Sequence, residues 1–243
     1  MQKTALYKKV TDTGGEAVFI KWLADNSLIL LLSLGTVFTF VWLLVLKDRL
    51  RIKWYAALVL SVLHTVFGVL SVKLFAIIEG FGDPDAVGNM SLFGGIFFMP
   101  LVYFLGSRIT KRSTSQVFDI FTPCMIFTVM CARVNCIVSG CCLGLYIPGT
   151  EHIRWPTREL EIILYAVLLL ILCPKIYKGK SSGEIYPLYM ACYGAFRFVI
   201  EFFRVSGQTA GIFHLSHIWA ALSFILGLSI YFEIKNKNKK VRR

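Results

Sequence analysis

Long apolar stretches alternate with short polar joints along most of the chain. They lie at approximately residues 27–46, 55–78, 92–106, 117–139, 159–173, 185–203 and 212–232. Most approach the roughly 20 apolar residues that an α-helix needs to cross a bilayer core about 30 Å thick. The pattern therefore predicts an all-α polytopic membrane protein with about seven transmembrane helices. The third stretch is short and contains glycines, so we expect it to be broken or buried among the others.

The two ends of the chain are polar and differ in kind. Residues 1–26 contain only a short amphipathic stretch at 17–23, which favours an interfacial segment over a membrane span. Residues 234–243 are rich in Lys and Arg. We therefore divide the chain into an N-terminal interfacial segment (1–26), a seven-helix transmembrane domain (27–233) and a basic tail (234–243).

Basic residues concentrate in every second polar joint and in the tail. They are Lys47, Arg49, Arg51 and Lys53, then Arg108, Lys111 and Arg112, then Lys175, Lys178 and Lys180, and finally Lys235, Lys237, Lys239, Lys240, Arg242 and Arg243. Of the joints between these, one contains only acidic charges and the other is mixed. Joints rich in Lys and Arg stay on the cytoplasmic side of a membrane. The alternation predicts an N-terminus outside and a C-terminus in the cytoplasm, which seven spans satisfy.

The composition excludes a soluble globular protein. Of the 243 residues, 56% are hydrophobic and 16% are charged, whereas a soluble domain has about 25% charged residues. The net charge is +12, but the charges lie in the joints, where orientation signals belong, so we expect no nucleic-acid partner. Seven cysteines in a chain without a separate extracellular domain do not indicate a disulfide scaffold.

Ionisable residues inside apolar stretches are costly and are functional candidates. Arg197, Glu201 and Arg204 lie on one face of the sixth predicted helix, with Tyr193 one turn earlier. An internal salt bridge that neutralises itself is one interpretation. The other is an anion site, because one acid against two arginines leaves positive charge and a guanidinium group suits phosphate oxygens.

Two further cations lie inside predicted spans. Arg133 has no acid within one turn of its own helix, so it must pair with another helix, reach water or bind an anion. Its predicted position is in the same outer half of the bundle as the Arg197 triad, which favours a shared anion site, with a phospholipid headgroup as the commonest anion there. The Lys73 side chain could instead extend so that its ammonium group reaches the membrane surface. His64 resembles a hydrogen-bonded core histidine.

A cysteine-containing segment follows Arg133 directly, from Ser139 and Gly140 to Cys141 and Cys142. Together with Cys136 the cysteines have the spacing C-x4-C-C, which is not that of a structural zinc site, so we expect no metal. A thiolate activated by Arg133 is conceivable. The simpler interpretation is a tight, glycine-flanked turn that closes the outer end of the helix.

Several segments, taken in order, resemble the bacterial prolipoprotein diacylglyceryl transferase family over roughly residues 70–232. They are Ser91-Leu92-Phe93-Gly94-Gly95, Phe118-Asp119-Ile120-Phe121-Thr122-Pro123, Arg133 through Gly144, Trp155-Pro156-Thr157 through Glu161, and Tyr193-Gly194-Ala195-Phe196-Arg197 through Glu201-Phe202-Phe203-Arg204. The last is the most specific, because it reproduces the pattern Tyr-Gly-x-x-Arg-x-x-x-Glu-x-x-Arg. The family's seven spans and outward N-terminus agree with the charge pattern of the joints.

The resemblance implies transfer of the diacylglyceryl group of phosphatidylglycerol to the lipobox cysteine of a prolipoprotein, at the outer face of the bacterial cytoplasmic membrane and without a cofactor. It implies that Arg133 and Arg197 bind the phosphate and stabilise the departing anion, with Glu201 orienting Arg197. It also implies that Gly94 and Gly95 let the lipid approach the backbone. Further implied substrate-binding positions are Lys73, Phe93, Ser139, Gly140, Cys141, Tyr193 and Arg204.

The chain departs from the family pattern at several polar positions. Phe93 stands where the family often has His or Tyr, and Cys136, Ser139 and Cys141 replace two asparagines and a glutamate of the signature. Two hypotheses therefore compete with an active transferase. One is a non-catalytic or differently specific lipid-binding relative, and the other is a thiol-redox membrane protein that uses Cys141 and Cys142.

Overall fold

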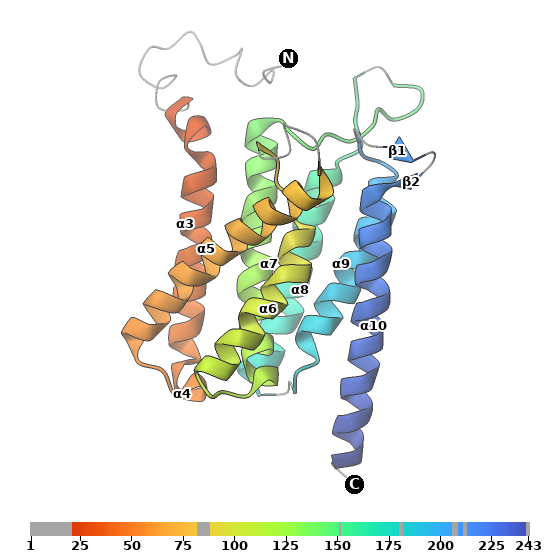
Figure 1. The fold of residues 1–243 in the computed structure, drawn as a ribbon. Helices are drawn as coiled ribbons and strands as arrows, with labels where there is room; N and C mark the ends of the chain where they lie inside the picture. Colours follow the sequence, from red (N-terminus) through yellow and green to blue (C-terminus); the bar gives the residue numbers. More distant parts are fainter. Residues whose placement is uncertain are drawn as a thin grey trace.

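A computed structural model describes residues 21–81, 88–150, 152–179, 182–205, 209–210 and 213–241. Most of the predicted interfacial segment 1–26, Asp83 and Asp85 of the second joint, Lys180 and the last two arginines lie outside these residues. The described chain is helical apart from one small antiparallel hairpin (Figure 1). The elements are α3 (Ser27–Val45), α4 (Lys47–Leu50), α5 (Trp54–Glu79), α6 (Phe93–Ile109), α7 (Thr114–Ser139), α8 (Thr157–Tyr177), α9 (Ile185–Glu201), β1 (Thr209–Ala210), β2 (Phe213–His214) and α10 (Leu215–Val241).

Each of the apolar stretches predicted from the sequence coincides with one long helix, which confirms the helical, polytopic class. Five helices are long and apolar enough to cross a membrane, namely α3, α5, α7, α8 and α10. The other two, α6 and α9, have 17 residues each. α6 is a single helix in spite of Pro100, and its first turn and one later face are buried.

α10 continues further than the apolar pattern indicated. The helix extends to Val241, so most of the basic segment 234–243 prolongs it instead of forming a separate tail. The residues added are mainly Lys, Asn and Glu on an exposed helix end. Lysine and glutamate are good helix formers, and the i, i+4 pair between Glu233 and Lys237, with Oε1 and Nζ 2.9 Å apart, lies in this extension.

α7 forms the centre of the bundle. In its apolar window 67% of the residues are buried, against 17–28% in the other four long helices. It contacts α3, α6, α8 and α9, while α10 packs mainly on α9. The long helices run alternately up and down, so the N-terminal end of α3 and the C-terminal ends of α5, α7 and α9 share one end of the molecule (Figure 1).

Two polar or small residues fix how these helices meet. Asp119 on α7 accepts hydrogen bonds from the backbone amides of Gly183 (2.7 Å) and Ile185 (3.0 Å), which anchors the start of α9. At Gly94 a Cβ atom would lie 2.1 Å from the carbonyl oxygen of Ser71, so α6 approaches α5 there backbone to backbone. Both contacts hold α6 and α9 in place around α7.

Candidate active site

Buried ion pairs join α7, α8 and α9 near one end of the bundle. Glu161 on α8 lies between two arginines: its Oε2 is 2.5 Å from Arg133 Nε, and its Oε1 is 2.7 Å from Arg197 Nη1. All three side chains are nearly inaccessible to solvent. Burying charges in this way is tolerable only because each is paired. Arg133 thus finds its acid on the next helix.

The predicted triad on α9 is also present. Arg197 Nη2 lies 2.7 Å from Glu201 Oε2, and Arg204 Nη1 lies 3.7 Å from the same oxygen. The internal bridge within α9 therefore exists, but Arg197 is shared between Glu201 and Glu161. We define the arginine cluster as Arg133, Arg197 and Arg204 together with Glu161 and Glu201.

Sequence reasoning missed Glu161 as a member of this cluster. It lies in the segment from Trp155 to Glu161 that resembles a family motif, but the ion pair joins different helices, and no spacing rule connects Arg133 to a residue 28 positions later. One signal was available. Arg133 had no acid within one turn of its own helix, and Glu161 was one of two acids, with Glu159, in the apolar stretch that follows.

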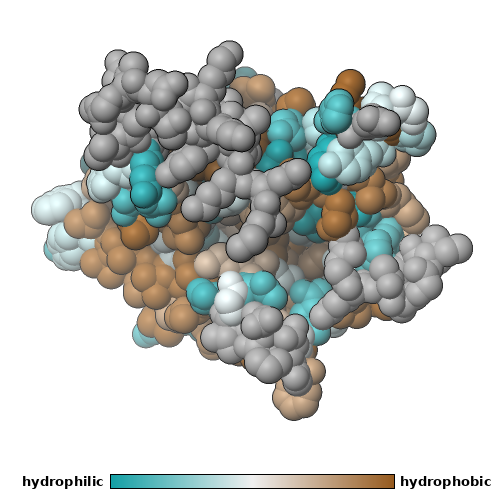
Figure 2. Space-filling model, turned by 90° about the horizontal axis from the view of Figure 1, so that it is seen from above, coloured by the Kyte–Doolittle hydropathy of each residue, from teal (hydrophilic) through white to brown (hydrophobic). Residues whose placement is uncertain are grey.

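A cavity of about 280 Å³ opens beside the arginine cluster. Its lining combines charged residues with the beginnings of α6 and α10, and consists of Glu79, Met90, Ser91, Leu92, Phe93, Arg133, Cys142, Tyr193, Arg197, Glu201, Arg204, Val205 and Ser216. Seen from this end, hydrophilic side chains gather on the described surface, while the flanks are mostly apolar (Figure 2). The cavity therefore places charged groups at the end of an apolar bundle.

Some buried donors at this cavity have no hydrogen-bond partner among the described residues. They include the Tyr193 hydroxyl group and the Nε atoms of Arg197 and Arg204. Buried polar groups normally find partners, so unsatisfied ones at a cavity indicate a place for a polar ligand. The charge count is balanced, since three arginines face Glu161, Glu201 and Glu79. The site thus offers oriented N–H and O–H donors and not the net positive charge inferred from α9 alone.

The remaining predicted site residues fall into separate groups. Phe93 and Tyr193 line the charged cavity, and their rings meet edge to face at 5.7 Å. Gly94 is explained by helix packing, because α5 occupies the space that an approaching lipid would need. Gly95 lines a different, apolar cavity. Lys73 lies half-buried on α5, outside the set of residues that line the charged cavity.

Ser139, Gly140 and Cys141 form the turn that ends α7. Gly140 adopts φ 70° as the C-terminal cap of the helix, which confirms the predicted glycine-based turn. Cys141 is exposed, whereas Cys142 follows with φ 56° and lines the charged cavity. Hydrogen bonds from the Cys136 and Cys141 thiols, with the nearby guanidinium groups of the arginine cluster, lower the pKa of the Cys142 thiol.

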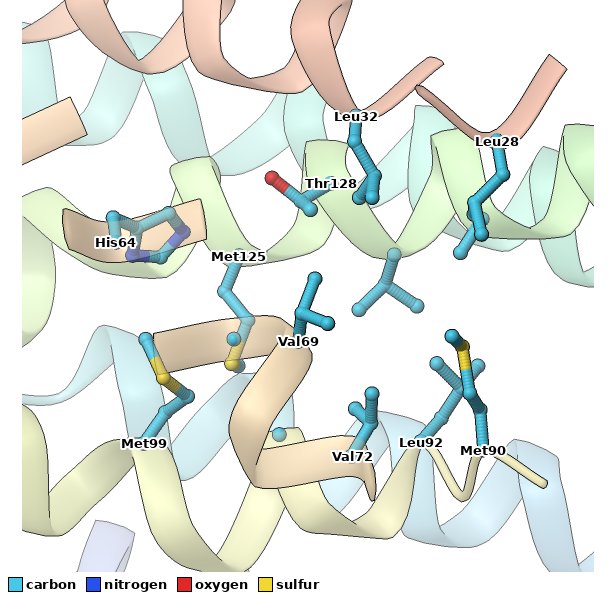
Figure 3. A pocket seen from close by; sticks show the side chains of 14 residues that line it. Leu28, Leu32, His64, Val69, Val72, Met90, Leu92, Met99, Met125 and Thr128 are labelled. Atoms are coloured by element: carbon cyan, nitrogen blue, oxygen red, sulfur yellow. The ribbon is translucent and has the colours of Figure 1, made fainter. Parts of the chain in front are cut away.

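An apolar cavity of about 70 Å³ adjoins the charged one between α3, α5, α6 and α7. The side chains of Leu28, Leu32, Val69, Val72 and Met125 point into it (Figure 3). Met90 and Leu92 line both cavities. A larger apolar cavity of about 370 Å³ shares His64 and Met99 with this one and lies towards the opposite end of the bundle. The charged cavity and the two apolar cavities therefore follow one another along the bundle, each sharing lining residues with the next.

The family model of prolipoprotein diacylglyceryl transferase matches residues 30–233, which include every member of the arginine cluster. The chain belongs to this family. The match bears out the resemblance noted from the motifs. With its apolar helices, it makes the protein a multi-pass cell-membrane member of the prolipoprotein diacylglyceryl transferase family.

Individual members of the family are similar to this chain at low identity over much of its length. A phosphatidylglycerol–prolipoprotein diacylglyceryl transferase of Dehalococcoides mccartyi (strain BAV1) is 23% identical over 216 residues, covering 80% of this chain and 81% of that protein. The enzyme of the same name from strain 195 is 21% identical and covers 92% and 93%. That of Erwinia tasmaniensis is 28% identical over 158 residues and covers 52% and 54%.

Proposed function

We propose that this protein transfers the diacylglyceryl group of phosphatidylglycerol to the cysteine thiol of a prolipoprotein and releases glycerol phosphate. The observation that carries the proposal is the arginine cluster at a charged cavity that lies next to an apolar one. A phospholipid has the same division into an anionic headgroup and apolar chains. The names of its relatives support the same donor and acceptor.

The carboxylates orient the arginines and leave donors for a phosphate. A guanidinium group has five N–H donors in a planar fork. Glu161 engages Nε of Arg133 and one nitrogen of Arg197, so both terminal nitrogens of Arg133 remain for the cavity. As the bond between glyceryl carbon and phosphate oxygen breaks, negative charge grows on the leaving phosphate. Donors fixed in advance around that oxygen stabilise the transition state most.

The acceptor thiol must lose its proton before its sulfur attacks the glyceryl carbon. Phe93 cannot take a proton, although the family often has His or Tyr at this position. Glu79 lies at the end of α5 and lines the same cavity, next to Ser91. We assign the Glu79 carboxylate as the group that accepts the thiol proton, after which the thiolate displaces glycerol phosphate and a thioether forms. Glu79→Gln then lowers the rate most between the pKa of Glu79 and that of the acceptor thiol, where the wild type has an ionised base and little of the thiol is free thiolate.

The contiguous apolar cavities suit the acyl chains of the lipid donor. Met90 and Leu92 lie at the junction between the charged cavity and the apolar one, and Gly95 lines the apolar side. A headgroup held by the arginines would direct its hydrocarbon chains past these residues. Lys73, Ser139, Gly140 and Cys141 remain proposed contacts of the lipid headgroup or of the lipobox peptide at this end of the bundle.

Seven spans with the N-terminus outside complete the proposal. All the basic joints lie at the end of the bundle opposite the arginine cluster, so the positive-inside rule places the charged cavity at the outer face. Cysteine probes at Asn89 and Lys178, in a chain without its own exposed cysteine, test this orientation. An impermeant maleimide labels Asn89→Cys in intact cells and labels Lys178→Cys only after permeabilisation. The reverse pattern would disprove the orientation.

Lysine substitutions test the headgroup clamp. Arg133→Lys and Arg197→Lys keep the positive charge and can still pair with Glu161, but they lose the planar fork. Losing one oriented donor in such a site costs about 3–4 kcal/mol, a factor of several hundred in rate. The matched control is Arg154→Lys, since Arg154 lies at the same end and donates to the Gly144 carbonyl (3.0 Å) without lining the cavity.

The assay is diacylglyceryl transfer from phosphatidylglycerol to a lipobox peptide in proteoliposomes, with rescue of a transferase-depleted bacterium as the cellular counterpart. We expect activity for the wild type and Arg154→Lys and almost none for the two cluster variants at normal abundance. Turnover of both cluster variants within about threefold of wild type would refute the clamp. An inert wild type that still binds anionic lipid would support the non-catalytic hypothesis instead.

A further inference from the structure

The turn after α7 brings together three thiol groups that lie apart in the chain. The sulfur atoms of Cys136, Cys141 and Cys142 all lie within 4.8 Å of one another. Cys136 belongs to the last turn of α7, and the other two follow the glycine cap. The spacing along the chain differs from that of a structural zinc site, but Gly140 reverses the backbone and returns the later cysteines to the helix end.

The backbone of this turn adopts a conformation that favours the cluster. Cys142 has φ 56°, a left-handed conformation that few non-glycine residues adopt. Such a residue is strained unless the surroundings hold it there, and these conformations concentrate at binding and catalytic sites. Here the left-handed residue follows the capping glycine closely and contributes one of the three sulfurs.

The first turn of α8 holds the cluster from outside. Arg158 Nη1 donates to the carbonyl oxygens of Cys136 (3.1 Å) and Cys141 (3.3 Å), and Thr157 Oγ1 donates to that of Cys142 (3.5 Å). All three cysteine backbones are therefore tied to two consecutive residues of one helix. Outer contacts of this type orient the ligands of metal sites.

We propose that Cys136, Cys141 and Cys142 form a three-thiolate site for Zn²⁺, with solvent as the fourth ligand. At a zinc–sulfur distance of about 2.3 Å, tetrahedral ligands lie about 3.8 Å apart. The present separations, within 4.8 Å, require shifts of only about 1 Å, which side-chain rotation supplies. Cys141 is exposed, so an ion can enter and keep one solvent ligand. A disulfide, in contrast, would need two sulfurs at about 2.05 Å and would leave the third thiol without a role.

The charges around the three sulfur atoms also favour Zn²⁺ at this site. Three thiolates and Zn²⁺ carry one net negative charge, and Cys142 shares the charged cavity with Arg133 and Arg204. The site borders the proposed substrate cavity through Cys142, but no step of the transfer reaction passes through a cysteine of this chain. The zinc site can therefore exist whether or not the protein is a transferase.

The test measures zinc in the full chain purified in detergent under reducing conditions. After equilibration with Zn²⁺ and gel filtration, mass spectrometry of the metal gives the content per chain. We expect one Zn²⁺ in the wild type and in the control Cys173→Ser, whose thiol lies on α8 away from the turn. The triple variant Cys136→Ser/Cys141→Ser/Cys142→Ser should retain less than a tenth of this. Circular dichroism confirms that the variants are folded.

Two further measurements test the geometry independently of folding. Co²⁺ in the site should give thiolate-to-metal charge-transfer absorption that is absent from the triple variant. Arg158→Gln leaves all three thiols in place, and we expect it to weaken zinc binding about tenfold in a chelator competition. Zinc retained equally by the triple variant, a wild type that retains none, or a disulfide between any two of these cysteines in the zinc-treated protein would overturn the proposal.

Discussion

Glu161 is the residue through which three helices share buried charge, and replacing it tests this arrangement directly. In Glu161→Gln the side chain keeps its size but loses its negative charge. The amide oxygen can accept from one arginine, while the amide nitrogen is a donor that faces the other guanidinium group. In the wild type the two carboxylate oxygens lie 2.5 Å from Arg133 Nε and 2.7 Å from Arg197 Nη1. A neutral amide cannot balance the charges of both guanidinium groups.

The expected loss of stability follows from burial. Side chains of both arginines are 5–7% exposed and that of Glu161 is 2% exposed, so water does not replace the missing charge. Removing one partner of a buried ion pair costs about 3–5 kcal/mol, because the remaining charge is left uncompensated. For a chain of this length, 1 kcal/mol corresponds to about 2–4 °C in melting temperature. We therefore expect the melting temperature to fall by about 6–20 °C.

The assay is thermal unfolding in detergent, followed by circular dichroism at a fixed heating rate. The matched control is Glu233→Gln, which removes a carboxylate from an exposed pair with Lys237 on α10. Exposed i, i+4 pairs contribute about 0.3–0.5 kcal/mol, so the control should unfold within 1–2 °C of wild type by the same conversion. If Glu161→Gln unfolds as close to wild type as the control does, the ion pairs do not hold α7, α8 and α9 together.

Two further substitutions probe the contacts that position the site. Gly94→Ala places a Cβ atom 2.1 Å from the Ser71 carbonyl oxygen. We expect a loss of about 1–3 kcal/mol in thermal unfolding, whereas Gly68→Ala, which meets nothing within 4 Å, should be neutral. Asp119→Asn leaves one acceptor oxygen for two backbone amides, at a cost of about 1–3 kcal/mol. Hydrogen exchange at the start of α9 should accelerate in Asp119→Asn and stay unchanged in the exposed control Asp48→Asn. Equal exchange rates in both variants would show that Asp119 does not anchor the helix.

Local patterns in the sequence were sufficient for most of the fold. Each long helix follows from an apolar run, and the Arg197–Glu201 pair follows from its i, i+4 spacing, because both depend on neighbours within one segment. The C-terminal end of α10 could not be predicted in this way. Its polar residues were interpreted as the end of a span, although lysine-rich segments can continue a helix.

Contacts between segments were beyond the reach of these patterns. Glu161 meets Arg133 only after α7 and α8 pack side by side, and the sequence does not specify the rotation of either helix. The same holds for Gly94, which could equally have admitted a lipid or another helix. The thiol cluster depends on the left-handed backbone at Gly140 and Cys142, and only the glycine could be anticipated.

The ion pair between Arg133 and Glu161 also bears on how the protein enters the membrane during synthesis. An arginine or an acid in the middle of a single span costs about 2.5–3.5 kcal/mol at insertion. Arg133 on α7 and Glu161 on α8 carry opposite charges on consecutive helices. Both lie nearer one end of their helix than its centre, so either helix alone enters the bilayer at up to this cost. Entering as a helical hairpin lets each charge neutralise the other. α9 brings Arg197 together with its own Glu201 and can follow by itself. The charges that line the cavity therefore also favour an order of assembly. In this order α7 and α8 leave the insertion machinery together, as a helical hairpin.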